Sequence, residues 1–92
     1  MHTGTLRVRL LVRQSRSLKD KRQVVQSIKE RLRNAFNVSV AEVDARDHRQ
    51  LAVLGLAMVG SEVAPIKGAF EEIVAALRAH PVAEFLDHEL EV

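Results

Sequence analysis

The sequence has no cysteine, tryptophan or tyrosine, and only three phenylalanines among its 92 residues. Without cysteine, the chain has no disulfide, no thiolate nucleophile and no zinc or iron–sulfur site built on thiolates. Its longest apolar run, residues 51–59, is much shorter than the roughly 20 residues that a membrane-spanning helix needs. Nothing at the N-terminus resembles a secretory signal. We therefore expect a cytoplasmic protein that does not enter a membrane and relies on its hydrophobic core for stability.

Positive charge is scarce over most of the chain and concentrated in its first third. The net charge is only +2, yet residues 1–33 hold ten Lys and Arg against two acids, a balance of +8. Residues 34–92 hold four Lys and Arg against ten acids, a balance of −6. This asymmetry indicates an anionic partner for one surface, unless the fold brings the acidic part against the basic part and cancels its field. Both outcomes are open at this level.

The first third of the chain predicts a strand followed by a helix. Residues 5–13 alternate between apolar and polar side chains, as in a half-buried strand. Ser17 and Asp20 form a capping-box-like start for a helix over residues 18–34. The apolar stripe of this helix is predicted to contain Leu18, Val25, Ile28, Leu32 and Ala35. Its solvent face is predicted to carry Lys19, Arg22, Gln26, Lys29 and Arg33.

Two further strands are predicted next. Residues 36–45 alternate until Val43, which breaks the register and indicates a bulge or a change of face near Glu42. Residues 51–59 are apolar at nearly every position, as in a central strand that is covered on both faces.

The last third predicts a helix and a strand. The helix covers residues 62–79, has Pro65 in its first turn and ends at His80 and Pro81. The final strand covers residues 84–92. Its alternation predicts Leu86, His88, Leu90 and Val92 on one side, and Phe85, Asp87, Glu89 and Glu91 on the other.

The order β-α-β-β-α-β predicts a single α+β domain over residues 1–92. Two right-handed crossovers and one hairpin produce a split βαβ sheet with both helices on one face. The first and third strands would be central, and the other sheet face would be uncovered. That open face would show Arg7, Arg9 and Arg13 beside alternate apolar residues of 51–59.

Three stretches, SLKDKR at 17–22, FNVSVAEVD at 36–44 and LAVLG at 51–55, together resemble the YlxP-like family of small bacterial proteins. The likeness covers nearly the whole chain. It implies a ferredoxin-like βαββαβ sandwich, with a four-stranded antiparallel sheet and two helices on one face. The family is a domain of unknown function without an established active site, so the resemblance implies little chemistry. Its members tend to be encoded near translation and ribosome-maturation factors, which implies association with RNA or the ribosome.

The first helix is the leading candidate for an anion-binding surface. At its start, basic side chains gather around free backbone N–H groups that suit a phosphate, although Asp20 competes for that place. Along its outer side the basic residues extend over roughly 20 Å at ~1.5 Å per residue, enough for several phosphates. A solubilising helix face is the alternative. The residues predicted to contact phosphate are Arg16, Lys19, Lys21, Arg22, Lys29 and Arg33.

The open sheet face, with Arg7, Arg9 and Arg13, is a second candidate. Related sheets bind RNA by stacking bases on aromatic side chains, and this chain is too poor in aromatics for that mode. Binding would therefore be to backbone and shape. The alternative is a homodimer interface in which the three arginines form the rim.

No catalytic, metal or cofactor site is predicted. The acids and histidine at Glu42, Asp44, Asp47 and His48 match no metal motif and are expected to be a solvated loop. There is no glycine-rich phosphate loop and no serine nucleophile elbow. We therefore expect a non-catalytic domain that associates with structured RNA or a ribosomal surface, or alternatively a module that self-associates through its open sheet face.

Overall fold

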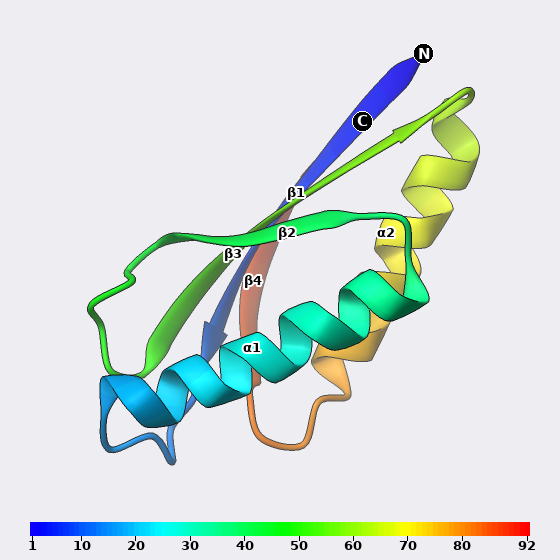
Figure 1. Cartoon of the computed structure of the whole chain (residues 1–92). Coiled ribbons are helices and arrows are strands. Elements are labelled where there is room, and N and C mark those ends of the chain that lie inside the picture. Colours follow the sequence, from blue (N-terminus) through cyan, green and yellow to red (C-terminus); the bar gives the residue numbers. More distant parts are fainter.

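The computed structural model describes residues 1–92 and confirms the predicted α+β ferredoxin-like fold (Figure 1). The strands form one antiparallel sheet in the order β2-β3-β1-β4, so the first and third strands are central as expected. Both helices lie on the same side of the sheet. The elements are β1 (His2–Leu11), α1 (Leu18–Ala35), β2 (Ser39–Asp44), β3 (Leu51–Gly60), α2 (Val63–Arg78) and β4 (Glu84–Glu91).

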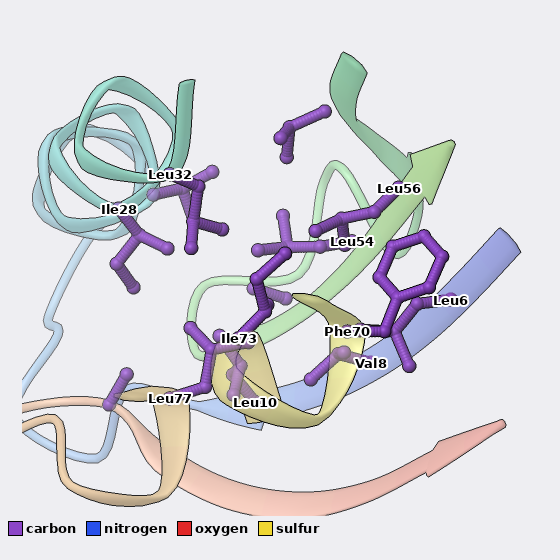
Figure 2. Close-up of a cluster of buried hydrophobic side chains, with 14 of the residues drawn as sticks. Leu6, Val8, Leu10, Ile28, Leu32, Leu54, Leu56, Phe70, Ile73 and Leu77 are labelled. Carbon is purple, nitrogen blue, oxygen red and sulfur yellow. The ribbon is translucent and has the colours of Figure 1, made fainter. Parts of the chain in front are cut away.

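The core lies between the sheet and the two helices (Figure 2). Leu6, Val8 and Leu10 of β1 alternate toward the helices, and the antiparallel register sets them beside Leu56, Leu54 and Ala52 of β3. Full burial of one such aliphatic side chain is worth about 1.5–3 kcal/mol. The helices complete the core with Val25, Ile28 and Leu32 from α1 and Ile66, Phe70, Ile73 and Leu77 from α2.

The two helices cover different parts of the sheet. The helix α2 packs against β1, β3 and β4, whereas α1 packs toward the edge strand β2. At the start of α1, the Ser17 hydroxyl accepts a hydrogen bond from the Asp20 amide at 3.1 Å, which confirms the predicted cap. Because α1 packs toward β2, its long outer side runs beside that strand and faces solvent. Neither helix is long and apolar enough to cross a lipid bilayer.

Two bulges interrupt the sheet, and only one of them was predicted. The register of β2 shifts between Glu42 and Asp44, which confirms the predicted bulge. A second shift lies opposite Arg9 and Leu10 of β1, where β4 has one extra residue. Because of that residue, Phe85 pairs with Leu10 and packs against the core.

The predicted faces of β4 were therefore wrong for its first residues. Phe85 lies on the helix side together with His88, and their ring centroids are 5.6 Å apart. The guanidinium of Arg78 covers the Phe85 ring at 4.3 Å. Strict alternation cannot anticipate such a shift, because a single bulged residue reverses the faces of all residues before it.

Candidate functional site

Four of the ten basic side chains in residues 1–33 form ion pairs, and every partner carboxylate comes from residues 34–92. The acidic part of the chain therefore neutralises the basic part only in places. The pairs are Arg7–Asp44, Arg9–Asp87, Arg13–Glu84 and Lys21–Glu42.

Three of these pairs lie on the open sheet face. Arg9 donates from Nε to Asp87 Oδ1 at 2.9 Å and from Nη2 to Oδ2 at 2.6 Å, a two-point contact. The hydrogen bonds from Arg9 lower the pKa of Asp87 below its usual value. Arg13, just past the end of β1, donates a single hydrogen bond from Nε to Glu84 Oε2 at the start of β4.

The open sheet face is consequently acidic. Its three arginines meet five carboxylates, so the face is negative by two charges, and each arginine already has a carboxylate partner. Phosphate binding by these arginines is therefore disfavoured. The carboxylates are Asp44, Glu84, Asp87, Glu89 and Glu91.

Lys21 was wrongly included among the phosphate-binding residues. Its side chain is fully buried, with 0% exposure, on the face of α1 that packs against the sheet. Its ammonium group donates to the carbonyl oxygens of Ala45 at 2.9 Å, Arg46 at 3.2 Å and Leu51 at 3.1 Å. No part of this group is available to a ligand.

The buried ammonium group holds the β2–β3 loop against the start of α1. An ammonium has three protons, and three carbonyls accept them, two in the loop and one at the first residue of β3. Glu42 Oε2 lies 2.9 Å from Lys21 Nζ but has no aligned donor, so this contact is electrostatic rather than a hydrogen bond. The loop turns at Ala45, which has a left-handed backbone (φ 54°). Capturing these carbonyls fixes the position of the loop side chains, including Arg46.

The basic side chains on the outer flank of α1 are not neutralised by carboxylates. Lys19, Arg22 and Lys29 form no ion pair. Arg33 donates from one arm to Val40 O on β2 at 2.8 Å, which anchors its side chain without neutralising it. Spacings of three, seven and four residues place these four side chains on one flank of α1, the flank beside β2. We call these four residues the α1 stripe.

The β2–β3 loop adds a cation that the sequence interpretation missed. A shallow hollow of about 690 Å³ beside α1 is lined by Lys19, Arg22 and Lys29 and by Arg46 of the loop. Arg46 forms no ion pair, and the nearby acids Glu42 and Asp44 pair with Lys21 and Arg7 instead. Lys21 donates to the Arg46 carbonyl oxygen, and this tertiary contact holds Arg46 near the stripe.

The predicted phosphate site at the start of α1 is occupied by the protein itself. The Asp20 carboxylate accepts a hydrogen bond from the Arg16 amide at 3.0 Å, and Ser17 caps the helix. The Arg16 side chain instead lines a polar hollow of about 500 Å³ with His48 and Arg49. The start of α1 thus contributes exposed arginine side chains rather than free backbone N–H groups.

The acids and histidine of the β2–β3 region do not converge on a metal site. Glu42 faces Lys21, and Asp44 faces Arg7. His48 Nδ1 accepts hydrogen bonds from the amides of Gln50 and Leu51 at 3.1 and 2.9 Å, closing the turn before β3. No group of three or more potential metal ligands occurs in the structure.

Comparisons with known proteins identify the family. A family model described as "Protein of unknown function (DUF503)" matches residues 3–90. The chain is also 34% identical over 68 residues to YlxP of Bacillus subtilis (strain 168), an uncharacterised protein, with 74% of each chain covered. Together with the ferredoxin-like fold, this confirms the predicted resemblance. The chain belongs to the DUF503 family, which contains YlxP-like proteins.

Proposed function

We propose that the protein is a non-catalytic module that binds the phosphate backbone of structured RNA, including RNA at a ribosomal surface, through the α1 stripe. One observation carries the proposal. Carboxylates neutralise the arginines of the sheet face and the buried lysine, whereas no carboxylate pairs with the basic side chains on the outer flank of α1. Within residues 1–33, most of the positive charge that remains unpaired therefore lies on one flank of α1.

The dimensions of this surface suit several phosphates. From Lys19 to Arg33 the stripe extends over ~20 Å at ~1.5 Å per residue. Arg46 flanks its first half, and Arg16 extends it toward the β1–α1 loop. Two acids line the hollow beside the stripe: Glu30 accepts a hydrogen bond from Gln26, and Glu42 faces the buried Lys21, so neither pairs with a base of the stripe.

The aromatic residues support recognition of backbone and shape rather than of bases. Phe70 is fully buried, and Phe36 and Phe85 pack against the same core. None of the three lies on the open sheet face, where related folds stack bases. Phosphate contacts position a protein on RNA but carry little sequence information.

Salt titration against ribosomal RNA fragments that contain duplex regions tests the proposal. About five phosphate contacts predict a slope of log K against log salt of about −4 to −5. We expect binding at low salt that weakens steeply as salt rises. Lack of binding at low salt, or an affinity that does not change with salt, would refute the proposal.

Charge reversal locates the binding surface. Arg22→Glu in the α1 stripe should weaken RNA affinity roughly tenfold at low salt and reduce the magnitude of the slope by about 1. Lys67→Glu is the matched control, because Lys67 is exposed on α2 and its substitution changes the net charge equally. Equal losses from both variants would show that only net charge matters and that the stripe is not the binding surface.

A further inference from the structure

The open face of the sheet carries a shallow trough over the middle of β3. Its floor is formed by small side chains, and its volume of about 510 Å³ is in the range of ligand sites. A second hollow continues along β2 and β3 as far as Val59. Val43 and Val59, near the two ends, are each 54% exposed. The result is an elongated groove of small and apolar residues that runs along the strands.

The register of the sheet explains one end of this trough. Gly55 of β3 lies between Arg7 of β1 and Ala41 of β2. Arg7 extends toward Asp44 on β2, at 3.6 Å, and Val43 leans over the glycine, since a Cβ at Gly55 would lie 2.7 Å from Val43 Cγ1. Because Arg7 points toward β2, it leaves its direct neighbour on β4, Glu89, without an ion pair.

The charge of the trough determines which kind of ligand can bind there. Glu89 and Glu91 line it and form no ion pair, while every arginine of the face is already paired. The negative face repels phosphate, so RNA does not fit it. Two copies meeting sheet to sheet would bring two negative faces together, which also disfavours self-association in that geometry. A cationic partner is complementary.

We propose that this trough docks an extended segment of a partner protein that carries Lys or Arg at alternate positions. Glu89 and Glu91 are two residues apart on the same face of β4, so their Cα atoms are separated by about 6.8 Å. An extended segment lying along β4 presents cations at that spacing on one edge. Its intervening small or apolar side chains then enter the trough beside Ala57. This surface lies on the opposite side of the sheet from α1, so both ligands can bind one molecule.

The test uses a synthetic peptide that alternates Lys with Val, followed by NMR of the isotopically labelled full chain at low salt. We expect the amide signals of Gly55, Ala57 and Glu89 to shift and those of the α1 stripe to stay in place. A peptide of the same composition with its lysines grouped at one end is the control for spacing. Equal binding by that control would overturn the proposal.

Neutralising the two glutamates tests the charge. Glu89→Gln combined with Glu91→Gln should weaken binding of the alternating peptide roughly three- to thirtyfold at low salt. Glu71→Gln with Glu72→Gln removes the same charge from the exposed side of α2 and should have little effect. Equal weakening by both double variants would overturn the proposal. Sedimentation is the other check: a dimer strengthened by the Glu89 and Glu91 substitutions would assign the face to a second copy instead.

Discussion

Lys21 joins two segments that are far apart in the sequence. It occupies a position in α1 that the spacing of its neighbours assigns to the core, between Leu18 and Val25. Its aliphatic stem can pack like a hydrophobic side chain, while its charged end reaches the loop carbonyls. The same contact positions Arg46 beside the α1 stripe, so stability and the proposed binding surface depend on one residue.

Replacing Lys21 tests this role. Lys21→Met keeps the apolar stem but leaves the Glu42 carboxylate, which is only 11% exposed, without its counter-charge. Removing one partner of a buried ion pair typically costs about 3–5 kcal/mol. We expect the free energy of unfolding, measured by urea denaturation, to fall by that amount. Arg22→Met, one position along on the exposed side, should change it by less than about 0.5 kcal/mol. Similar values for the two variants would contradict the structural role of Lys21.

The burial of Lys21 was predictable, but its partners were not. The series Leu18, Val25, Ile28 and Leu32 has spacings of three and four only if position 21 is included. The charge of the residue suggested a surface role, and the position contradicted it. Its acceptors lie 24 to 30 residues away in a loop, at a separation where no sequence periodicity operates.

At the scale of elements, the regular parts followed from sequence and the irregular parts did not. Alternation in β1 and the three-four spacing in both helices predicted the strands, the helices and most of the core correctly, although Ala35, assigned to the apolar stripe of α1, is exposed. The bulge in β2 was visible because Val43 interrupts an alternating run. The bulge in β4 was not visible in the sequence, because Phe85 takes its place through tertiary contacts with Leu10 and Arg78.

The turn between α2 and β4 gives a pH-dependent prediction. His80 Nδ1 accepts hydrogen bonds from the amides of Val82 and Ala83 at 3.2 and 3.0 Å, so this nitrogen carries no proton in the folded state. Burial, with the nearby Arg31 charge, lowers the pKa of His80 below its usual 6.5. As pH falls, the unfolded chain therefore binds this proton first. The stability from this turn is fully present above about pH 6.5 and is lost as pH falls toward the lowered pKa.

The measurement is the urea midpoint of unfolding between about pH 8 and about pH 5.5. His80→Asn keeps a side-chain acceptor for the turn but cannot titrate. We expect the midpoint of the variant to decline less over this interval than that of the original protein, because every other titrating group is unchanged. Parallel curves would show that His80 does not contribute to the acid sensitivity.

At the scale of the whole molecule, the fold determines which charges neutralise one another, whereas the sequence gives only their number and order. The excess of bases in residues 1–33 and of acids in residues 34–92 was evident. The sequence did not reveal which of these charges would cancel. Arg9 meets Asp87 and Arg13 meets Glu84 because the first and last strands pair, and the partners are 78 and 71 residues apart in the chain. Strand pairing therefore neutralises Arg7, Arg9 and Arg13 and leaves the cations of α1 in excess. The outcome is a basic helical side and an acidic sheet side.

Such segregation has a cost in stability that can be measured together with binding. Lys29 and Arg33 are four residues apart in α1, and like charges at this spacing destabilise a helix. Lys29→Glu replaces this repulsion with an attractive pair of favourable orientation, so it should raise the free energy of unfolding by about 0.5 kcal/mol. The same change should weaken RNA affinity. Lys67→Glu is the control. It places a like charge beside Glu71 on α2, so it should lower the free energy of unfolding slightly and leave RNA affinity unchanged. Urea denaturation and RNA titration of the two variants therefore distinguish two roles for the basic face of α1. If Lys29→Glu lowers the free energy of unfolding, the face serves stability. If it raises the free energy of unfolding and weakens RNA affinity, the face is retained for binding.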